Sequence, residues 1–402
     1  MNPNQTSQMK HVAHFLFLLP LILGAGCGDS DAASASEAWV WDLPDEILPP
    51  RVPEDNPMST AKVELGRFLF YDTRLSANET QSCASCHQQE LAFTDGLAQA
   101  EGSTGEIHPR NSMMVANAGY AASLTWANNV VDKLEEQALV PMFGEEPVEL
   151  GMAGMEDELL RRMRDDARYP GMFAAAFPGE DDPIVIGNIT KAIAAFQRQL
   201  TSFNSKYDRW NRRDTTALNA SEQRGMALFF GGTTEAGVTD ALECFHCHGG
   251  FLFSQASDHE QNTFDQKSFI NNGLYNLDDD GSYPTGNQGI YDLSFDPEDK
   301  GKFKPPSLRN IAVTGPYMHD GSIETLEAVL RHYERGGRSV PEGTMINGED
   351  VSGDGRDNPN KSNFLNGFEI TDQEREDVLA FLRALTDEEF LSNPAYSDPF
   401  VE

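Results

Sequence analysis

Apolar residues recur at helical spacing in several separate stretches of the chain, which predicts amphipathic helices. The first helix is expected from Ser59 to about Tyr71, because the apolar residues between them fall on one face. Further helices are expected at 130–140, 156–168, 184–203, 322–333 and 371–385. Strand-like alternation extends over no more than a few residues at a time, so we predict a mostly α fold.

Two of the predicted helix starts have a local signal in the sequence. Asn219 stands three residues before Glu222, and Thr371 stands three residues before Glu374, which is the spacing of a capping box. The polar segment 205–219 comes before the first of these starts, and we place a domain boundary there.

Two long segments lack periodicity and are rich in Gly and polar residues, so we predict loops at 87–120 and 249–302. The chain length fits two domains followed by a short tail. The predicted boundaries are 57–204 for the first domain, 205–387 for the second and 388–402 for the C-terminal tail.

The N-terminal segment has the features of a bacterial targeting sequence. An apolar run at 15–23 is followed by small residues and then by Cys27. Residues 1–27 therefore predict a lipoprotein-type signal peptide that leaves a lipidated Cys27, with ordinary signal cleavage nearby as the alternative. Residues 28–56 are rich in Ser, Ala, Asp, Glu and Pro and predict a flexible tether. We expect a periplasmic protein.

The charge balance narrows the range of partners. The chain has 64 acidic and 30 basic residues and a formal net charge of −34. Such a charge disfavours binding to nucleic acid and attraction to anionic lipid. No apolar run beyond the N-terminal segment is long enough to span a bilayer, so we expect membrane attachment only through a lipid anchor at Cys27.

Two short motifs carry the strongest chemical signal. Each has the form Cys-x-x-Cys-His, which lets two thiols form thioether bonds to one haem while the histidine ligates the iron. A redox dithiol or a zinc site of four thiolates are the alternatives, but neither requires a histidine directly after each second cysteine. The predicted ligands of two covalently bound haem c groups are Cys83, Cys86, His87, Cys244, Cys247 and His248.

With these motifs placed, the chain from about residue 65 to 385 resembles the bacterial di-haem cytochrome c peroxidase and MauG family. The resemblance is carried by LGRFLFYDTRLS before the first motif, by PRNS at 109–112, by FKPPSLRN at 303–310 and by TGPYMHDGS at 314–322. Within the family the chain is most similar to the MbnH-like branch. The resemblance implies two tandem cytochrome c-type domains with their haems facing the inter-domain region.

The resemblance also implies roles for residues around the first haem, which is the haem that meets peroxide in this family. Gln137 and Glu149 match the residues that orient peroxide and move its proton. Glu145 and Glu146 remain alternatives for the second role, because the spacing differs from that of MauG. Pro141 matches a proline that keeps the sixth iron position clear.

Residues between the two haems can be matched in the same way. Trp126 matches the tryptophan that lies between the haems, and His319 matches a pocket histidine near the first haem. Asn111, Thr314 and Pro316 match the ligands of an inter-haem calcium ion, which a side-chain oxygen and backbone carbonyls hold.

Two positions separate the branches of the family. Tyr333 matches the axial ligand of the second haem, where peroxidases that take electrons from a cytochrome have methionine; His332 and Met345 are the alternatives. Reductively activated peroxidases also carry a loop histidine that blocks the first haem. Ser103 occupies that place here, and His108 is the histidine nearest to it.

The resemblance therefore implies an enzyme that uses hydrogen peroxide to form a high-valent di-haem state and then oxidises a tryptophan of a partner protein. The copper-binding protein MbnP is the type of partner expected. The first alternative is a peroxidase that reduces hydrogen peroxide with electrons from a small cytochrome c or cupredoxin. The second alternative is a di-haem cytochrome that transfers electrons without catalysis.

Overall fold

The computed structural model describes residues 39–401, except 232, 235–236, 239–241 and 260–266. The predicted signal peptide, Cys27 and the start of the predicted tether lie outside the described residues. Among the described residues, no helix combines the length and the apolar character needed to cross a membrane.

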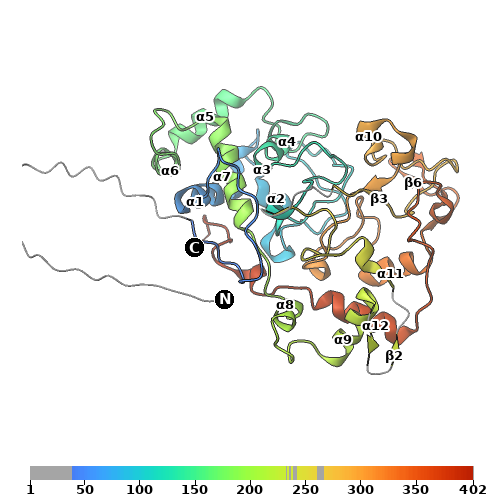
Figure 1. Cartoon of the computed structure of the whole chain (residues 1–402). Helices are drawn as coiled ribbons and strands as arrows, with labels where there is room; N and C mark the ends of the chain where they lie inside the picture. Colours follow the sequence, from blue (N-terminus) through green and yellow to red (C-terminus); the bar gives the residue numbers. More distant parts are fainter. Residues whose placement is uncertain (1–38, 232, 235–236, 239–241, 260–266, 402) are drawn as a thin grey trace, which may run out of the picture. The chain divides into compact units, whose positions relative to one another are not determined.

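The helices of the described part of the chain, with little strand beside them, confirm the predicted mostly α fold (Figure 1). The helices are α1 (Thr60–Tyr71), α2 (Cys83–Cys86), α3 (Leu134–Gln137), α4 (Leu139–Phe143), α5 (Glu156–Asp165), α6 (Tyr169–Ala176), α7 (Ile186–Gln199), α8 (Lys206–Asn211), α9 (Ala220–Phe230), α10 (Tyr291–Ser294), α11 (Leu326–Glu334) and α12 (Asp372–Arg383). Long irregular segments connect them, as predicted for 87–120. The described residues of the predicted loop at 249–302 are also mostly irregular, but they include α10 and short strand segments.

Strands are confined to four two-stranded antiparallel pairs in the described residues. They are β1 (Thr233–Thr234) with β2 (Gly237–Val238), β3 (Ile270–Asn271) with β4 (Lys302–Phe303), β5 (Ser339–Val340) with β8 (Gly353–Asp354), and β6 (Met345–Ile346) with β7 (Glu349–Asp350). Each strand has two residues, so these pairs fix loops and do not form a layer of the fold.

Three sequence predictions about helices were wrong in detail. The helix predicted at 130–140 is replaced by α3 and α4, which begin only at Leu134. The helix predicted at 322–333 begins at Leu326, because the Thr325 side chain caps it by accepting a hydrogen bond from the Ala328 N–H. The polar connector 205–219 contains α8, whose capping box is formed by Ser205 and Asp208.

Two helix pairs pack in the same way in different parts of the chain, a repeat that the sequence analysis did not find. In the first pair, α1 crosses α7 where Gly66 faces the backbone of Ala192; a Cβ on Gly66 would lie 1.9 Å from the Ala192 carbonyl oxygen. In the second pair, α9 crosses α12 where Gly225 faces Asp377, again with 1.9 Å to the carbonyl oxygen. Glycine is therefore required at both crossings.

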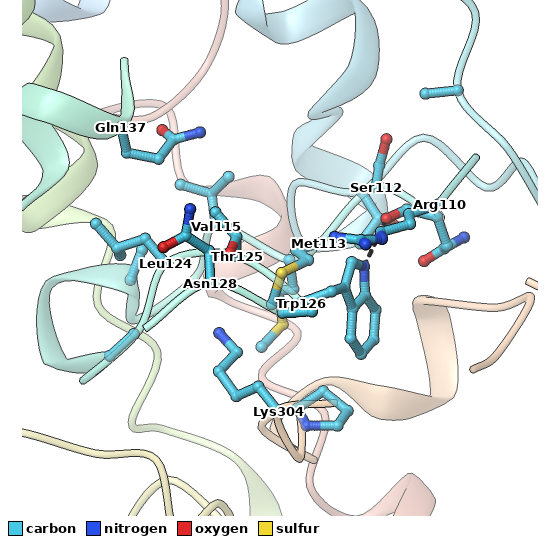
Figure 2. Close-up of a pocket in the computed structure, with 18 of the residues that line it drawn as sticks. Arg110, Ser112, Met113, Val115, Leu124, Thr125, Trp126, Asn128, Gln137 and Lys304 are labelled. Carbon is cyan, nitrogen blue, oxygen red and sulfur yellow. Dashed lines mark hydrogen bonds between the residues drawn. The ribbon is translucent and has the colours of Figure 1, made fainter. Parts of the chain in front are cut away.

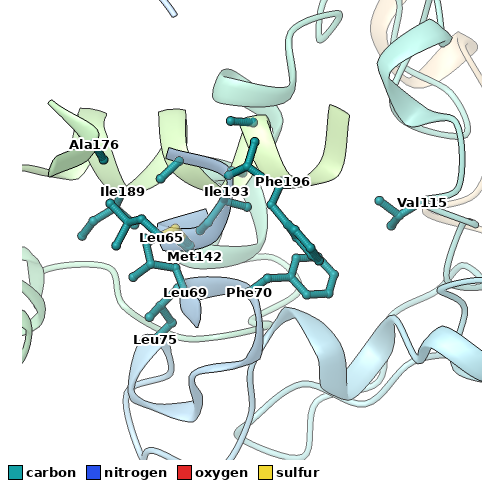
Figure 3. Close-up of a cluster of buried hydrophobic side chains, with 14 of the residues drawn as sticks. Leu65, Leu69, Phe70, Leu75, Val115, Met142, Ala176, Ile189, Ile193 and Phe196 are labelled. Atoms are coloured by element: carbon teal, nitrogen blue, oxygen red, sulfur yellow. The ribbon is translucent and has the colours of Figure 1, made fainter. Parts of the chain in front are cut away.

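An aromatic pair follows each crossing by one helical turn. Phe70 packs on Phe196 with ring centroids 5.3 Å apart, and Phe229 packs on Phe381 at 5.4 Å, each pair at an interplanar angle of 58°. The first pair belongs to a buried core that also includes Leu65, Leu69 and Ile193 (Figure 3). The two helix pairs thus supply two separate hydrophobic cores, one packed against each Cys-x-x-Cys-His motif.

After α12, which packs on α9, the C-terminal segment runs back to the first motif. The Gln89 side-chain amide donates hydrogen bonds to the carbonyl oxygens of Phe390, at 3.1 Å, and of Asn393, at 2.9 Å. The Phe390 ring, only 3% exposed, packs edge-on against Phe93 with centroids 5.7 Å apart. The last residues of the chain therefore complete the core around the first motif.

Candidate functional site

The first Cys-x-x-Cys-His motif forms a single helical turn, α2, with His87 directly after it. The His87 Nδ1 lies 2.8 Å from the carbonyl oxygen of Phe93. Because a carbonyl only accepts, Nδ1 carries the proton and donates it, which leaves Nε2 with a free electron pair. This is the tautomer that an iron-ligating histidine needs.

The second motif repeats this arrangement. Its cysteines lie in and directly after a 3₁₀ turn, and the His248 Nδ1 lies 3.1 Å from the carbonyl oxygen of Phe253. Burial lowers the pKa of both His87 and His248, so both imidazoles are neutral and able to ligate a metal.

The chemistry of the thiols argues against the two alternatives to haem. Burial raises the pKa of Cys83, Cys86 and Cys244 to about 12, whereas a redox dithiol needs a thiol whose pKa is lowered. All four motif cysteines are free of disulfides. No group of three or more His, Cys, Asp or Glu side chains within the described segments could hold a metal ion, which argues against a four-thiolate zinc site. The donor sets fit two haem c groups.

A cavity of about 560 Å³ lies beside the first motif and extends to the second part of the chain. Cys86 and His87 line one side, and residues between Lys304 and Met318 line the other. A narrower cavity of about 60 Å³ adjoins the first motif as well, and the two share several lining residues. Figure 2 shows Gln137, Trp126 and Lys304 reaching the larger cavity from different segments.

The structure brings Gln137 and Glu149 together, because both line both cavities next to His87. Burial raises the pKa of Glu149 to about 7. Glu145 and Glu146 are exposed, and although Glu146 lines the larger cavity, neither lines the narrow one, so Glu149 fits the predicted role better. Pro141 also lines the narrow cavity.

Pro141 is also the reason that Gln137 ends a helix. Proline has no N–H to donate to the carbonyl oxygen four residues earlier, which belongs to Gln137. The helix is interrupted there, and α4 starts at Leu139. The break leaves the Gln137 side chain on the cavity wall.

Trp126 lines the larger cavity and is 9% exposed. Its indole N–H donates a hydrogen bond of 2.8 Å to the carbonyl oxygen of Asn111, the contact drawn as a dashed line in Figure 2. The Trp126 carbonyl oxygen in turn accepts from the Lys304 N–H at 2.8 Å. One hydrogen bond therefore fixes the indole ring of Trp126, and the other fixes the backbone of the same residue.

The three predicted calcium ligands, Asn111, Thr314 and Pro316, line the same cavity. The Asn111 amide nitrogen donates to the Leu97 carbonyl oxygen at 2.6 Å, which leaves the amide oxygen as the donor atom toward a cation. Oxygen ligands of this kind suit a hard cation such as calcium. A calcium ion at this place stays a prediction, with which these residues agree.

His319 does not line either cavity beside the first motif. Its ring stacks on Phe303 with centroids 3.6 Å apart and is only 4% exposed. Burial lowers the pKa of His319 to about 4, so the ring is neutral. The residue touches the site through its backbone, because its carbonyl oxygen accepts from the Asn111 N–H at 2.8 Å.

The pKa of Tyr333, near the end of α11, is raised to about 12, mainly by burial and to a lesser degree by the nearby Cys247 and Cys244, while a hydrogen bond with the Asn272 side chain opposes the rise. The His332 ring is engaged elsewhere, since its Nε2 lies 2.9 Å from the Asn272 carbonyl oxygen. Met345 is 57% exposed in the β6–β7 hairpin. Tyr333 therefore lies near the cysteines of the second motif, and its role as the axial ligand stays a prediction.

Two cavity residues had no predicted role. Lys304 is 7% exposed, donates to the Ser123 carbonyl oxygen at 2.7 Å, and has its pKa lowered to about 7 by burial. It belongs to the FKPPSLRN motif, whose lysine could have been singled out. His108 lines both cavities, although the sequence did not indicate that its side chain points toward them.

Comparison with known proteins agrees with these features. Residues 60–216 match the model of the di-haem cytochrome c peroxidase family. The chain is 34% identical to the cytochrome-c peroxidase IdrP1 of Denitromonas iodatirespirans, with 92% of each chain covered. It is 33% identical to the methylamine utilization protein MauG of Methylorubrum extorquens, over 83% of this chain and 80% of that protein.

Solved structures give the same result. A MauG-like protein associated with microbial copper homeostasis is 46% identical, with a TM-score of 0.85 over 90% of this chain and 100% of the other. The di-haem peroxidase BthA of Burkholderia thailandensis, at 22% identity and a TM-score of 0.64, shares the fold. These matches and the two haem-binding motifs lead to one conclusion: the chain belongs to the di-haem cytochrome c peroxidase and MauG family of oxidoreductases.

Proposed function

We propose that the protein is a periplasmic di-haem enzyme that uses hydrogen peroxide to oxidise a tryptophan of a partner protein. The proposal rests on Tyr333, a buried tyrosine that lies near the cysteines of the second motif. A phenolate oxygen is a hard, anionic ligand that favours oxidised iron, whereas a thioether raises the reduction potential. Tyr333 therefore suits a haem that stores an oxidising equivalent.

The residues around the first motif supply the proton transfers. Glu149 accepts the proton that hydrogen peroxide loses on binding and returns it to the outer oxygen, which leaves as water when the O–O bond breaks. The Gln137 amide orients the peroxide by hydrogen bonding, and Pro141 offers no side-chain ligand to compete with it. When bound, the haem pair supplies the redox chemistry, with two electrons going to peroxide and two recovered from the substrate.

Trp126 gives the electrons a route through the protein. The indole is fixed by its hydrogen bond to Asn111, a residue that we also propose as a calcium ligand. A calcium ion held by Asn111, Thr314 and Pro316 would keep the carbonyl oxygen that Trp126 contacts in place. The partner can then be oxidised at the surface and need not enter the cavity.

The proposed partner is a copper-binding periplasmic protein of the MbnP type. The MauG-like protein that is 46% identical to this chain is associated with microbial copper homeostasis, which supports this class of partner. We further propose that the chain is anchored to the membrane by a lipid on Cys27, as its N-terminal sequence predicts.

A peroxidase that reduces hydrogen peroxide with electrons from a small cytochrome c or cupredoxin is the second candidate. The resemblance to the IdrP1 peroxidase, at 34% identity, favours it. Tyr333 in place of methionine and Ser103 in place of the loop histidine count against it. The Ser103 N–H donates to the Glu149 carbonyl oxygen at 2.7 Å, so this loop is already tied to the pocket.

One equivalent of hydrogen peroxide added to the fully oxidised protein separates the two functions. We expect a prompt change in the visible and near-infrared absorbance without any reductant, followed by oxidation of a tryptophan in the added partner, read by mass spectrometry. Tyr333→Met should raise the potential of the second haem and abolish the stable oxidised state. His332→Gln is the matched control and should leave that potential unchanged. A protein that reacts only after partial reduction would be a peroxidase.

A further inference from the structure

The loop at 100–108 is built onto the backbone that carries Glu149. The Ser103 N–H donates to the Glu149 carbonyl oxygen at 2.7 Å, and the His108 N–H closes the loop by donating to the Ala100 carbonyl oxygen at 2.8 Å. A Cβ on Gly102 would lie only 2.0 Å from the Val148 carbonyl oxygen, so glycine is required for this approach. The loop therefore holds His108 at a fixed place beside Glu149.

The His108 side chain faces the Glu149 carboxyl group. Its Nε2 lies 4.0 Å from the Glu149 Oε1, and both residues line the wide and the narrow cavities next to His87. This separation is longer than a hydrogen bond, but catalytic contacts are often long before substrate binds and shorten in the complex.

The hydrogen bonds of the His108 ring define its tautomer. The Arg110 backbone N–H donates to the His108 Nδ1 at 3.0 Å. The Arg110 carbonyl oxygen lies 3.2 Å from the same nitrogen, so the contact with the N–H is the shorter of the two. The shorter contact favours Nδ1 as the acceptor, which places the N–H on Nε2, the ring nitrogen nearest to the Glu149 carboxyl group.

We propose that His108 is a positioning residue of the peroxide pocket, whose Nε2–H holds the Glu149 carboxylate in the orientation that accepts and returns the peroxide proton. This inference rests on the proposed role of Glu149. It assigns His108 to the wall of the pocket and not to the iron.

The surroundings of the pair favour this role. The Arg110 guanidinium is the cation near the imidazole, and burial together with this charge keeps the pKa of His108 below its ordinary value. Glu101 and Glu106 are the other carboxylates that line the narrow cavity. A neutral imidazole with a fixed N–H can orient the Glu149 carboxylate without adding a charge to the pocket.

The test compares variants of the full-length, haem-loaded protein. His108→Phe removes the N–H and keeps a planar ring, and His108→Gln restores a side-chain N–H donor. We expect the second-order rate constant of the peroxide reaction to fall by about tenfold in His108→Phe and to recover in His108→Gln. The association rate of cyanide should change in parallel, because HCN also gives up a proton when it binds, without turnover.

A third comparison links the effect to Glu149. In a Glu149→Gln background, His108→Phe should cause no further loss, because the group that it positions can no longer take a proton. Ile107→Ala, in the same loop with a side chain 51% exposed, is the matched control and should behave as the wild type.

Two results would overturn the inference. Conversion of the first haem from low-spin to high-spin in His108→Phe, seen by electron paramagnetic resonance, would make His108 an iron ligand. Unchanged peroxide and cyanide rates with an unchanged spin state would remove His108 from the pocket chemistry. A wild-type protein that fails to react with peroxide would instead refute the proposed function itself.

Discussion

Glu149 is the residue whose ionisation should control the peroxide reaction. Burial raises its pKa from the ordinary 4.5 to about 7. A base acts only when it is ionised, so the rate of the wild-type reaction should rise from about pH 6 to about pH 8. Glu149→Gln should be slower and lack this dependence, which stopped-flow measurements across the range would check. A flat wild-type profile would remove Glu149 as the base.

The same pKa shift has a consequence for stability. The folded state binds the Glu149 proton more tightly than the unfolded state does, because its pKa is raised on folding. The wild type should therefore lose stability relative to Glu149→Gln as the pH rises from about 4.5 to about 7. Thermal unfolding at several pH values gives this difference without any turnover.

At the residue scale, the sequence predicted what depends on short spacing. The Cys-x-x-Cys-His motifs identify the haem ligands because all three residues lie within five positions. Gln137 and Glu149 could be proposed only through the family resemblance, since nothing local marks them. The orientation of the His108 side chain depends on the hydrogen bond from the Ser103 N–H to the Glu149 carbonyl oxygen. These two residues are far apart in the sequence, so the spacing of residues did not predict that orientation.

At the scale of elements, the glycines at the two helix crossings can be tested with a control in the same helix pair. Gly66→Ala would place a Cβ 1.9 Å from the Ala192 carbonyl oxygen and should cost about 1–3 kcal/mol of stability through overpacking. Gly187 lies in α7 with open space around it, so Gly187→Ala should be neutral or slightly stabilising. Denaturant unfolding of both variants measures the contrast; equal effects would contradict a tight crossing.

The helices that the sequence predicted well are those with local start signals. The capping boxes at Asn219 and Thr371 are present, with Glu222 and Glu374 as the partners. The prediction at 130–140 was wrong at its start, where Asn128 accepts from the Val130 and Val131 N–H groups in a turn and Lys133 is extended, so that the helix begins only at Leu134.

The break between α3 and α4 could have been read from Pro141, since a proline inside a helical pattern removes a backbone donor. The α9–α12 pair repeats the packing of the α1–α7 pair, and this repeat was not predicted. Its members are separated by more than a hundred residues, and the shared features are single Gly and Phe positions.

At the scale of the whole molecule, the two haem-binding parts are joined by the returning C-terminal segment. The described residues belong to one compact unit. The Tyr71 hydroxyl donates to the Tyr396 carbonyl oxygen at 2.7 Å, and the Phe400 ring packs edge-on against Phe68 at 5.3 Å. A fragment ending at residue 204, the predicted first domain, would lack these contacts and the Phe390 ring.

Phe390→Ala should therefore destabilise the part of the molecule that holds the first haem, although the substitution lies at the far end of the chain. Phe390 is 3% exposed against Phe93, whose carbonyl oxygen orients His87, and truncation of a buried phenylalanine costs about 3–5 kcal/mol. Phe400→Ala, in the same tail but 38% exposed, should cost much less. Thermal unfolding followed at the Soret band of each haem would show the first haem losing its native environment at a lower temperature in Phe390→Ala. If both haems instead shifted equally, the C-terminal segment would stabilise the molecule as a whole and not the first haem in particular.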